Sequence, residues 1–118
     1  KRTTQSKLKA AGLPWERSKA FNGSALFSEF VTAPHDMTHL GVELYVDDIL
    51  RQQGDVSLML YPPDVILPEL SQFLTLEDFD IVMTGTPAGV GPVKAGECFR
   101  GRVLNSEEEL VTAEWIAH

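Results

Sequence analysis

The sequence has little that would link it to a membrane, to nucleic acid or to an oxidising compartment. It contains one cysteine in 118 residues, so no disulfide can form within the chain. No apolar run approaches the roughly 20 residues that a membrane-spanning helix needs. Lysine and arginine are outnumbered by 17 acidic residues, and the net charge of −7 disfavours nucleic acid and anionic membranes as partners. We therefore expect a soluble cytoplasmic protein that binds neither.

The apolar residues, 43% of the total, follow patterns typical of short strands and few helices. Helical spacing predicts helices over 5–11, closed by Gly12, and over 64–73, distorted by Pro68. Alternation and β-type composition predict strands over 27–31, 40–46, 49–54, 81–83, 98–104 and 109–116. This order indicates a strand-rich α+β fold with mixed sheets. The chain does not begin with methionine, and we expect residues 1–118 to be a partial domain of a longer polypeptide.

The run Thr84-Gly85-Thr86-Pro87-Ala88-Gly89-Val90-Gly91 is the most informative stretch. Closely spaced glycines after a buried strand let backbone amides approach a ligand, and two threonine hydroxyls add donors. The run is therefore a candidate cradle for an anion or oxyanion; a plain tight turn is the alternative. A nucleotide-phosphate loop is disfavoured, because Val90 and Glu97 replace its glycine and lysine. The dinucleotide pattern fails because Lys94 occupies the third glycine position.

Other candidate residues are individually weaker. Lys19, in a loop among aromatic residues, could stabilise an enolate or move a proton, although an isolated lysine is more often a surface charge. His35 and His39 are spaced like zinc ligands on a helix, but this segment favours a loop, so metal binding there is disfavoured. Cys98 lies in an expected strand and is interpreted as a packing residue.

Several segments, read in order, resemble the carboxy-terminal part of the fumarylacetoacetate hydrolase family. The sequence is most similar to the branch that includes fumarylpyruvate-hydrolase-like proteins and the isomerase/decarboxylases of homoprotocatechuate breakdown. The matching text is Gln5, Gly12-Leu13-Pro14-Trp15, Lys19-Ala20-Phe21, Leu44-Tyr45-Val46, Arg51-Gln52-Gln53-Gly54, Leu74-Thr75-Leu76-Glu77, the run from Thr84 to Gly91, and Gly96.

The resemblance implies a mixed β-roll, a homodimer, and an enzyme of aromatic catabolism. It implies hydrolysis, decarboxylation or tautomerisation of 2-oxo acids through an enolate or oxyanion beside Mg²⁺, Mn²⁺ or Ca²⁺. It gives catalytic roles to Lys19 and Thr86, and substrate contacts to Gln5, Gly85 and Thr86. The family's metal ligands are expected upstream of Lys1, so none is assigned to this chain, which would need a complementing amino-terminal segment to act.

The sequence departs from the family pattern at Asn22 and Phe79. The missing metal ligands and Asn22 favour an alternative, a non-catalytic remnant or interaction domain that keeps the fold. The family pattern Lys-x-Phe-Asp reads Lys19-Ala20-Phe21-Asn22 here. Asn22 therefore replaces an aspartate, and a carboxylate near Lys19 is absent. Phe79 replaces a turn glycine, and we expect it to strain or reshape that turn.

Overall fold

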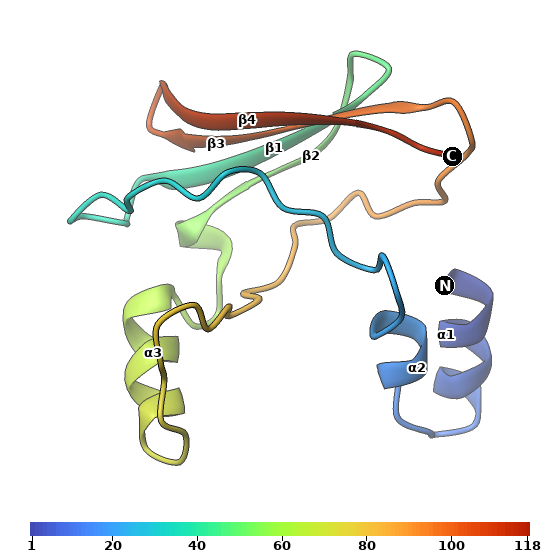
Figure 1. The fold of residues 1–118 in the computed structure, drawn as a ribbon, viewed down its shortest axis with the longest axis horizontal. Coiled ribbons are helices and arrows are strands. Elements are labelled where there is room, and N and C mark those ends of the chain that lie inside the picture. Colours follow the sequence, from blue (N-terminus) through green and yellow to red (C-terminus); the bar gives the residue numbers. More distant parts are fainter.

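The computed structural model describes residues 1–118, which are arranged around a four-stranded antiparallel sheet (Figure 1). The strand order is β2-β1-β3-β4. The strands are β1 (Leu40–Val46), β2 (Ile49–Asp55), β3 (Cys98–Asn105) and β4 (Glu108–Ile116). The helices are α1 (Arg2–Ala10), α2 (Glu16–Lys19), the short 3-10 helix η1 (Val56–Leu58) and α3 (Pro63–Ser71). The α+β class is confirmed, and every strand pair within this chain is antiparallel.

Two hairpins make the sheet, and both were predicted. Asp47 and Asp48 connect β1 to β2 with φ angles of 50° and 61°. Positive φ at both central residues is the geometry of two-residue turns that match the twist of paired strands. The second hairpin joins β3 to β4 through Ser106, at φ 56°. β3 then pairs along the whole of β1, from Leu40 opposite Asn105 to Val46 opposite Phe99.

The first helix ends as its sequence predicts. Gly12 adopts a left-handed φ of 66°, and its amide donates to the carbonyl of Lys9. The amide of Leu13 donates to the carbonyl of Leu8, which completes a glycine-terminated helix cap. Helix α3 begins with Pro63 in its first turn, where no amide hydrogen is needed, and runs through Pro68.

Two predicted strands are wrong. Residues 27–31 and 81–83 form no strand, because no segment of this chain pairs with them. The prediction that 81–83 are buried is also wrong, since Ile81 is 51% and Met83 75% exposed. β-type composition favours a strand only where a neighbouring backbone offers its hydrogen bonds.

The two faces of the sheet differ in chemistry. Side chains alternate along each strand, so the register places Val42, Leu44 and Val46 on one face. Their cross-strand neighbours on that apolar face are Gly101, Val103 and Phe99 of β3, and Val111, Ala113 and Trp115 of β4. Figure 1 shows the helices and the glycine-rich segment below the sheet, on the side that this face meets.

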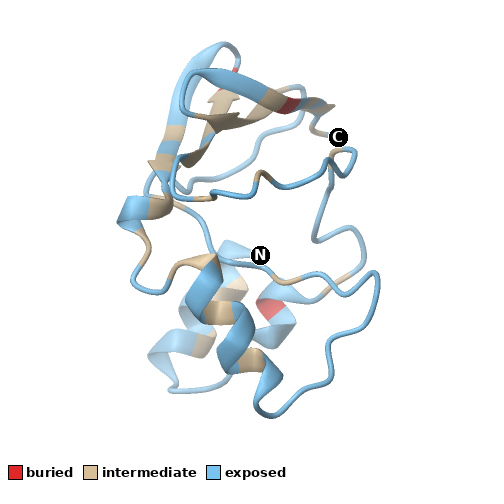
Figure 2. Cartoon of the chain, turned by 90° about the vertical axis from the view of Figure 1, so that its left-hand side faces the viewer, coloured by how far each residue is buried: buried red, intermediate tan, exposed pale blue.

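The chain buries very little of its surface. Only Ser18, Val46 and Val111 are buried, and Figure 2 shows exposed and half-buried positions almost everywhere else. The accessible surface is 9426 Å². A folded chain of this mass usually exposes roughly 6,300 Å². The radius of gyration, 15.8 Å, also exceeds the roughly 13.5 Å of a closed domain this long.

Candidate functional site

The glycine-rich segment 84–91 crosses the apolar side of the sheet at its β2 edge. The Gln52 side chain of β2 donates from Nε2 to Thr86 Oγ1 at 2.9 Å and to the Pro87 carbonyl at 2.7 Å. Gly54 lies so near Pro87 that a Cβ added to it would fall 2.8 Å from the Pro87 Cβ. The segment is therefore held against β2 by a side-chain clamp and by close backbone approach.

Two of its glycines are required by the backbone. Gly85 has φ 106° and Gly89 has φ 105°, conformations that residues with a Cβ rarely adopt. A Cβ on Gly89 would fall 2.0 Å from the Arg51 carbonyl oxygen. A Cβ added to Gly91 would meet no atom within 4 Å, so this position does not require glycine for lack of space. The segment contains no hydrogen-bonded turn, only a bend at Ala88, and Thr86 is exposed.

Lys19 and Gln5 lie on the helix pair at the amino-terminal end of the chain. Gln5 is half-buried on α1, and Lys19 is the exposed last residue of α2. The two helices pack against each other, and the amino group of Lys1 donates to the Ser18 carbonyl at 3.0 Å. Lys19 lines a shallow hollow with residues 12–16 and makes no ion pair or hydrogen bond through its side chain.

The structure places Lys19 and Thr86 in two separate hollows. Thr84, Gly85, Thr86 and Pro87 line an apolar hollow of 540 Å³ with residues of β1, β2 and α3. Lys19 lines a separate one. Figure 1 places α2 on the same side of the sheet as the glycine-rich segment. Convergence of the two groups on one substrate stays a prediction.

The histidine segment is a loop, as its sequence favoured. Asp36 accepts hydrogen bonds from the Thr38 amide at 2.9 Å and the Thr38 hydroxyl at 2.6 Å. These bonds lower the pKa of Asp36 and make it a turn residue. No group of three or more His, Cys, Asp or Glu side chains could hold a metal ion. The residues of this chain alone therefore do not fit the metal that the family resemblance implies.

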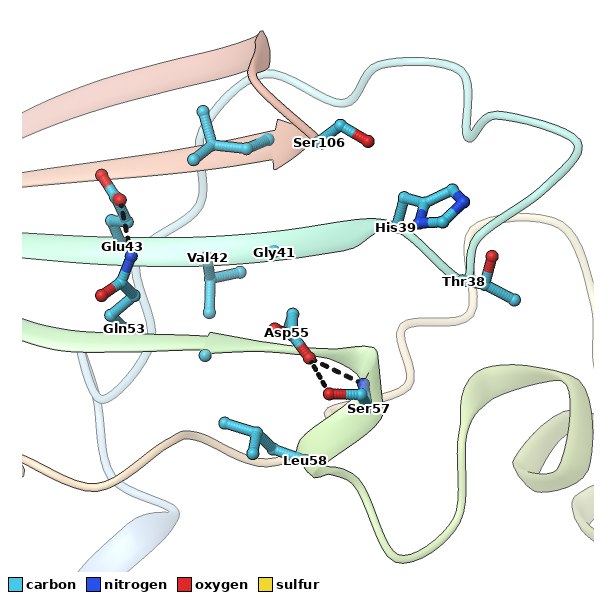
Figure 3. A pocket seen from close by; sticks show the side chains of 12 residues that line it. Thr38, His39, Gly41, Val42, Glu43, Gln53, Asp55, Ser57, Leu58 and Ser106 are labelled. Carbon is cyan, nitrogen blue, oxygen red and sulfur yellow. Dashed lines mark hydrogen bonds between the residues drawn. The ribbon is translucent and has the colours of Figure 1, made fainter.

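His39 lines the hollow drawn in Figure 3, together with Asp55 and Ser57. The mixture of histidine, carboxylate and hydroxyl suggests catalytic chemistry, but the hydrogen bonds give Asp55 another role. Its carboxylate accepts hydrogen bonds from the Ser57 hydroxyl and, at 2.8 Å, from the Ser57 amide, and so caps η1. These two bonds lower the pKa of Asp55. Figure 3 shows the His39 ring pointing away from this pair.

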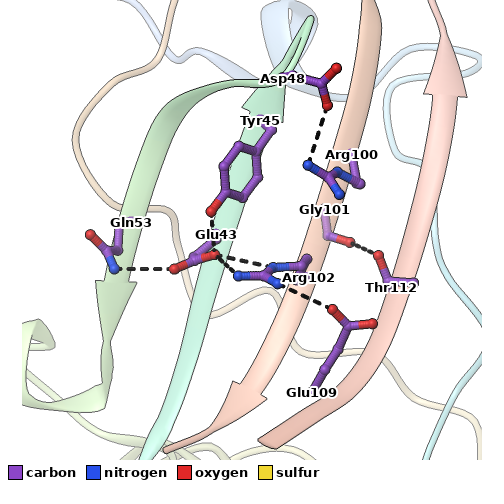
Figure 4. A network of polar contacts seen from close by, with 9 residues as sticks. All are labelled: Glu43, Tyr45, Asp48, Gln53, Arg100, Gly101, Arg102, Glu109 and Thr112. Atoms are coloured by element: carbon purple, nitrogen blue, oxygen red, sulfur yellow. Dashed lines mark hydrogen bonds and ion pairs between the residues drawn. The ribbon is translucent and has the colours of Figure 1, made fainter. Parts of the chain in front are cut away.

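The polar face of the sheet carries an ion-pair network (Figure 4). Arg102 pairs with Glu43 and also contacts Glu109. The Tyr45 hydroxyl donates to the same Glu43 oxygen at 2.9 Å, and both Arg100 and Arg102 lie over the Tyr45 ring. The hydrogen bond from Arg102, followed by that from Tyr45, lowers the pKa of Glu43. Every member of this network finds a partner within the sheet, so we assign it to stability.

Both departures from the family pattern are visible in the backbone. Asn22 and Gly23 form the predicted turn, in which the Ser24 amide donates to the Phe21 carbonyl. Phe79 adopts φ 75° with its side chain 99% exposed, which confirms that the substitution strains its turn. Cys98 begins β3 and donates its amide to Asp47 Oδ1 at 2.9 Å, as expected of a structural residue.

Gln52 is the residue that sequence reasoning missed. It belongs to a matched segment, Arg51-Gln52-Gln53-Gly54, but a polar residue on an edge strand carries no local signal of a contact 34 residues away. The only available hint was the presence of Gly54 on the strand and Gly89 in the segment, since each glycine permits a close approach between the two.

An open antiparallel sheet with a glycine-rich segment clamped over its apolar face defines the class of fold. A sequence model described as the fumarylacetoacetate hydrolase C-terminal domain matches residues 1–114. The chain therefore belongs to the fumarylacetoacetate hydrolase family, as the resemblance indicated.

Individual relatives agree with this assignment. An oxaloacetate tautomerase of Escherichia coli K12 is 39% identical over 81% of the chain and 45% of the relative. An oxaloacetate decarboxylase of Dictyostelium discoideum is 36% identical over 92% of the chain and 51% of the relative. A solved yeast protein of the same family superposes with a TM-score of 0.88 at 33% identity, over 99% of this chain and 52% of the yeast chain. The chain thus spans about half the length of the relatives it matches.

No helix in the structure has both the length and the apolar character needed to cross a membrane.

Proposed function

We propose that the natural gene product containing these residues is an enzyme that acts on 2-oxo acids through an enolate or oxyanion. The observation that carries the proposal is the 39% identity with an oxaloacetate tautomerase over 81% of the chain. Tautomerisation, decarboxylation and hydrolysis of an acylpyruvate share this intermediate, so all three remain candidate reactions. Oxaloacetate is the first substrate to test, because the tautomerase and the decarboxylase are both named for it.

The proposed roles follow from the chemistry of the groups. Negative charge develops on the 2-oxo oxygen when an enolate forms, and fixed donors that meet it lower the barrier. Thr86 and the Gly85 backbone supply such donors in an exposed segment. Lys19 supplies an ammonium group that can stabilise the enolate or move a proton. Gln5, on the helix packed against α2, is proposed to contact the substrate.

A divalent cation, Mg²⁺, Mn²⁺ or Ca²⁺, is part of the proposal only through residues outside this chain. The residues of the chain do not make a cation site, so no step is derived through the metal. We also propose that a second copy, or a complementing amino-terminal segment, covers the exposed apolar face. The proposed location is the cytoplasm, which suits a chain with a single cysteine.

The test uses the natural gene product with added Mg²⁺ and freshly dissolved enol-oxaloacetate. Faster loss of the enol absorbance without pyruvate indicates tautomerisation, and pyruvate formation indicates decarboxylation. An acylpyruvate offered in parallel yields pyruvate and a second carboxylic acid if the reaction is hydrolysis. A protein that leaves all these substrates untouched contradicts the proposal.

Lys19→Met should lower kcat by about a hundredfold if Lys19 acts as proposed. Lys7→Met is the matched control, because Lys7 is equally exposed, on α1, and has no proposed role. Equal activity of the two variants would remove Lys19 from the mechanism.

A non-catalytic remnant is the second candidate, favoured by Asn22 and by the strained turn at Phe79. Calorimetry with Mg²⁺ and oxalate, a stand-in for the enolate of a 2-oxo acid, distinguishes the two. Metal-dependent binding of oxalate argues against the remnant.

A further inference from the structure

The side chain of Gln52 is the one direct polar link between the sheet and the glycine-rich segment. Its Nε2 atom lies 2.9 Å from Thr86 Oγ1, 2.7 Å from the Pro87 carbonyl and 3.5 Å from the Ala88 carbonyl. An amide nitrogen carries two hydrogens, which match the two shorter contacts. Gln52 is half-buried, so its stem is held between β2 and the segment.

The contacts determine which end of the amide faces Thr86. A backbone carbonyl can only accept, so an amide oxygen turned toward Pro87 and Ala88 would meet acceptors alone. The nitrogen must therefore face the segment. It follows that Gln52 donates to the Thr86 hydroxyl, and that Thr86 Oγ1 accepts this bond.

The direction of this bond determines what Thr86 can offer a ligand. With one lone pair engaged by Gln52, the Thr86 hydroxyl keeps its own proton, which has no acceptor within the chain. A hydroxyl that accepts one hydrogen bond becomes a better donor in the next. The unpartnered hydroxyl proton of Thr86 thus favours a ligand oxygen that only accepts hydrogen bonds, such as a carboxylate or an enolate oxygen.

We infer that Gln52 is a positioning residue that makes the Thr86 hydroxyl a hydrogen-bond donor toward an anionic oxygen of the substrate. The inference rests on the proposed function and adds a residue to it. Gln52 touches no substrate in this account; it acts through Thr86.

The segment has a second anchor that does not depend on Gln52. Gly89 approaches the backbone carbonyl of Arg51, and the ring of Pro87 approaches Gly54. Gln52→Leu, which keeps the length of the stem but removes the donor, should therefore leave the segment near β2. Gln53→Leu is the matched control, because Gln53 is the next residue of the same strand and bonds Glu43 on the opposite face.

The experiment measures kcat and KM for oxaloacetate in the natural gene product carrying Gln52→Leu, Thr86→Val or both. Gln52→Leu should lower kcat/KM by roughly tenfold to a hundredfold, the cost of a misplaced catalytic donor. Gln53→Leu should stay near the wild type. In the Thr86→Val background, Gln52→Leu should cause no further loss, because its effect passes through the missing hydroxyl.

Gln52→Glu adds a readout that a purely structural role would not move. A carboxylate at this position accepts the Thr86 proton and withdraws it from the substrate, whereas a protonated carboxyl can still donate. The activity of Gln52→Glu relative to wild type should therefore fall as the pH rises through the titration of the introduced group.

The outcomes separate the two claims. An inactive wild-type protein overturns the proposed function and the inference together. An active wild type overturns the inference alone if Gln52→Leu keeps full activity, or if its loss is the same with and without Thr86.

Discussion

Phe79 is the one bulky side chain that the fold holds in the left-handed region, at φ 75°. Its ring is 99% exposed, so no packing within the chain compensates for the strain. Phe79→Gly should stabilise the natural gene product by about 1 kcal/mol, the relief of strain less the extra entropy of glycine in the unfolded chain. The urea midpoint measures this change. Phe73→Gly, at another exposed phenylalanine without positive φ, should give no gain.

A fall in the urea midpoint on Phe79→Gly would contradict this prediction. It would mean that the ring packs against residues outside the chain.

Glu43 should make the fold sensitive to acid. Its pKa lies below the usual 4.5 because Arg102 and Tyr45 donate to its carboxylate. The unfolded chain therefore takes up this proton more readily than the folded one, so the stabilisation is complete above pH 4.5 and is lost as the pH falls through the folded pKa. The urea midpoint should decrease as the pH is lowered through this range. Glu43→Gln should make that decrease smaller.

Glu114→Gln is the control for this measurement. Glu114 lies exposed on the same face of the sheet and makes no hydrogen bond. If it flattens the acid limb as much as Glu43→Gln does, the network in Figure 4 is not the cause.

Residue-level reasoning from the sequence succeeded where a backbone rule applied and failed where the partner lies far along the chain. Gly12 as a helix end and Phe79 as a strained replacement follow from local φ preferences alone. The bond from Gln52 to Thr86 spans 34 residues and depends on the path of the chain between them. The roles of Lys19, Thr86, Gln5 and Gly85 stay predictions.

At the scale of elements, the contact between β2 and the glycine-rich segment depends on Gly89. Gly89→Ala combines a disfavoured φ of 105° with a Cβ 2.0 Å from the Arg51 carbonyl oxygen. We expect a loss of about 2 kcal/mol or more, because the segment must move off the strand. Thermal unfolding measures the loss.

Gly91→Ala is the matched control two residues away. Its Cα faces open space and its φ is not in the left-handed region, so the change should stay within about 0.5 kcal/mol. Equal effects at Gly89 and Gly91 would contradict the close approach.

The four strands and two longer helices were predictable because each has a strong periodic pattern or a clear end signal. The missing strands at 27–31 and 81–83 share an apolar composition but have no pairing edge in this chain. Composition indicates that a segment suits a pleated, half-buried surface. Whether a neighbouring strand pairs with it depends on the tertiary structure.

For the molecule as a whole, the uncovered surface is the dominant feature. The accessible area of 9426 Å² exceeds the usual value for this mass by about 3,000 Å². A standard interface buries about 800 Å² per partner. The excess is larger than this and is comparable to the area exposed when a domain core is cut in two. Residues 1–118 made alone should therefore bind a hydrophobic dye and self-associate.

Dye fluorescence and sedimentation measure both properties. A monomeric, dye-silent preparation of residues 1–118 would contradict this expectation and would mean that the apolar face closes on itself.

Residues 20–39, between α2 and β1, form neither helix nor strand, so a long irregular connection joins Lys19 to the sheet that holds the Thr86 segment. If Lys19 and Thr86 serve one substrate, a partly folded molecule would keep these two groups apart and would not turn the substrate over. Turnover would then begin only once the helix pair and the sheet have taken their final positions.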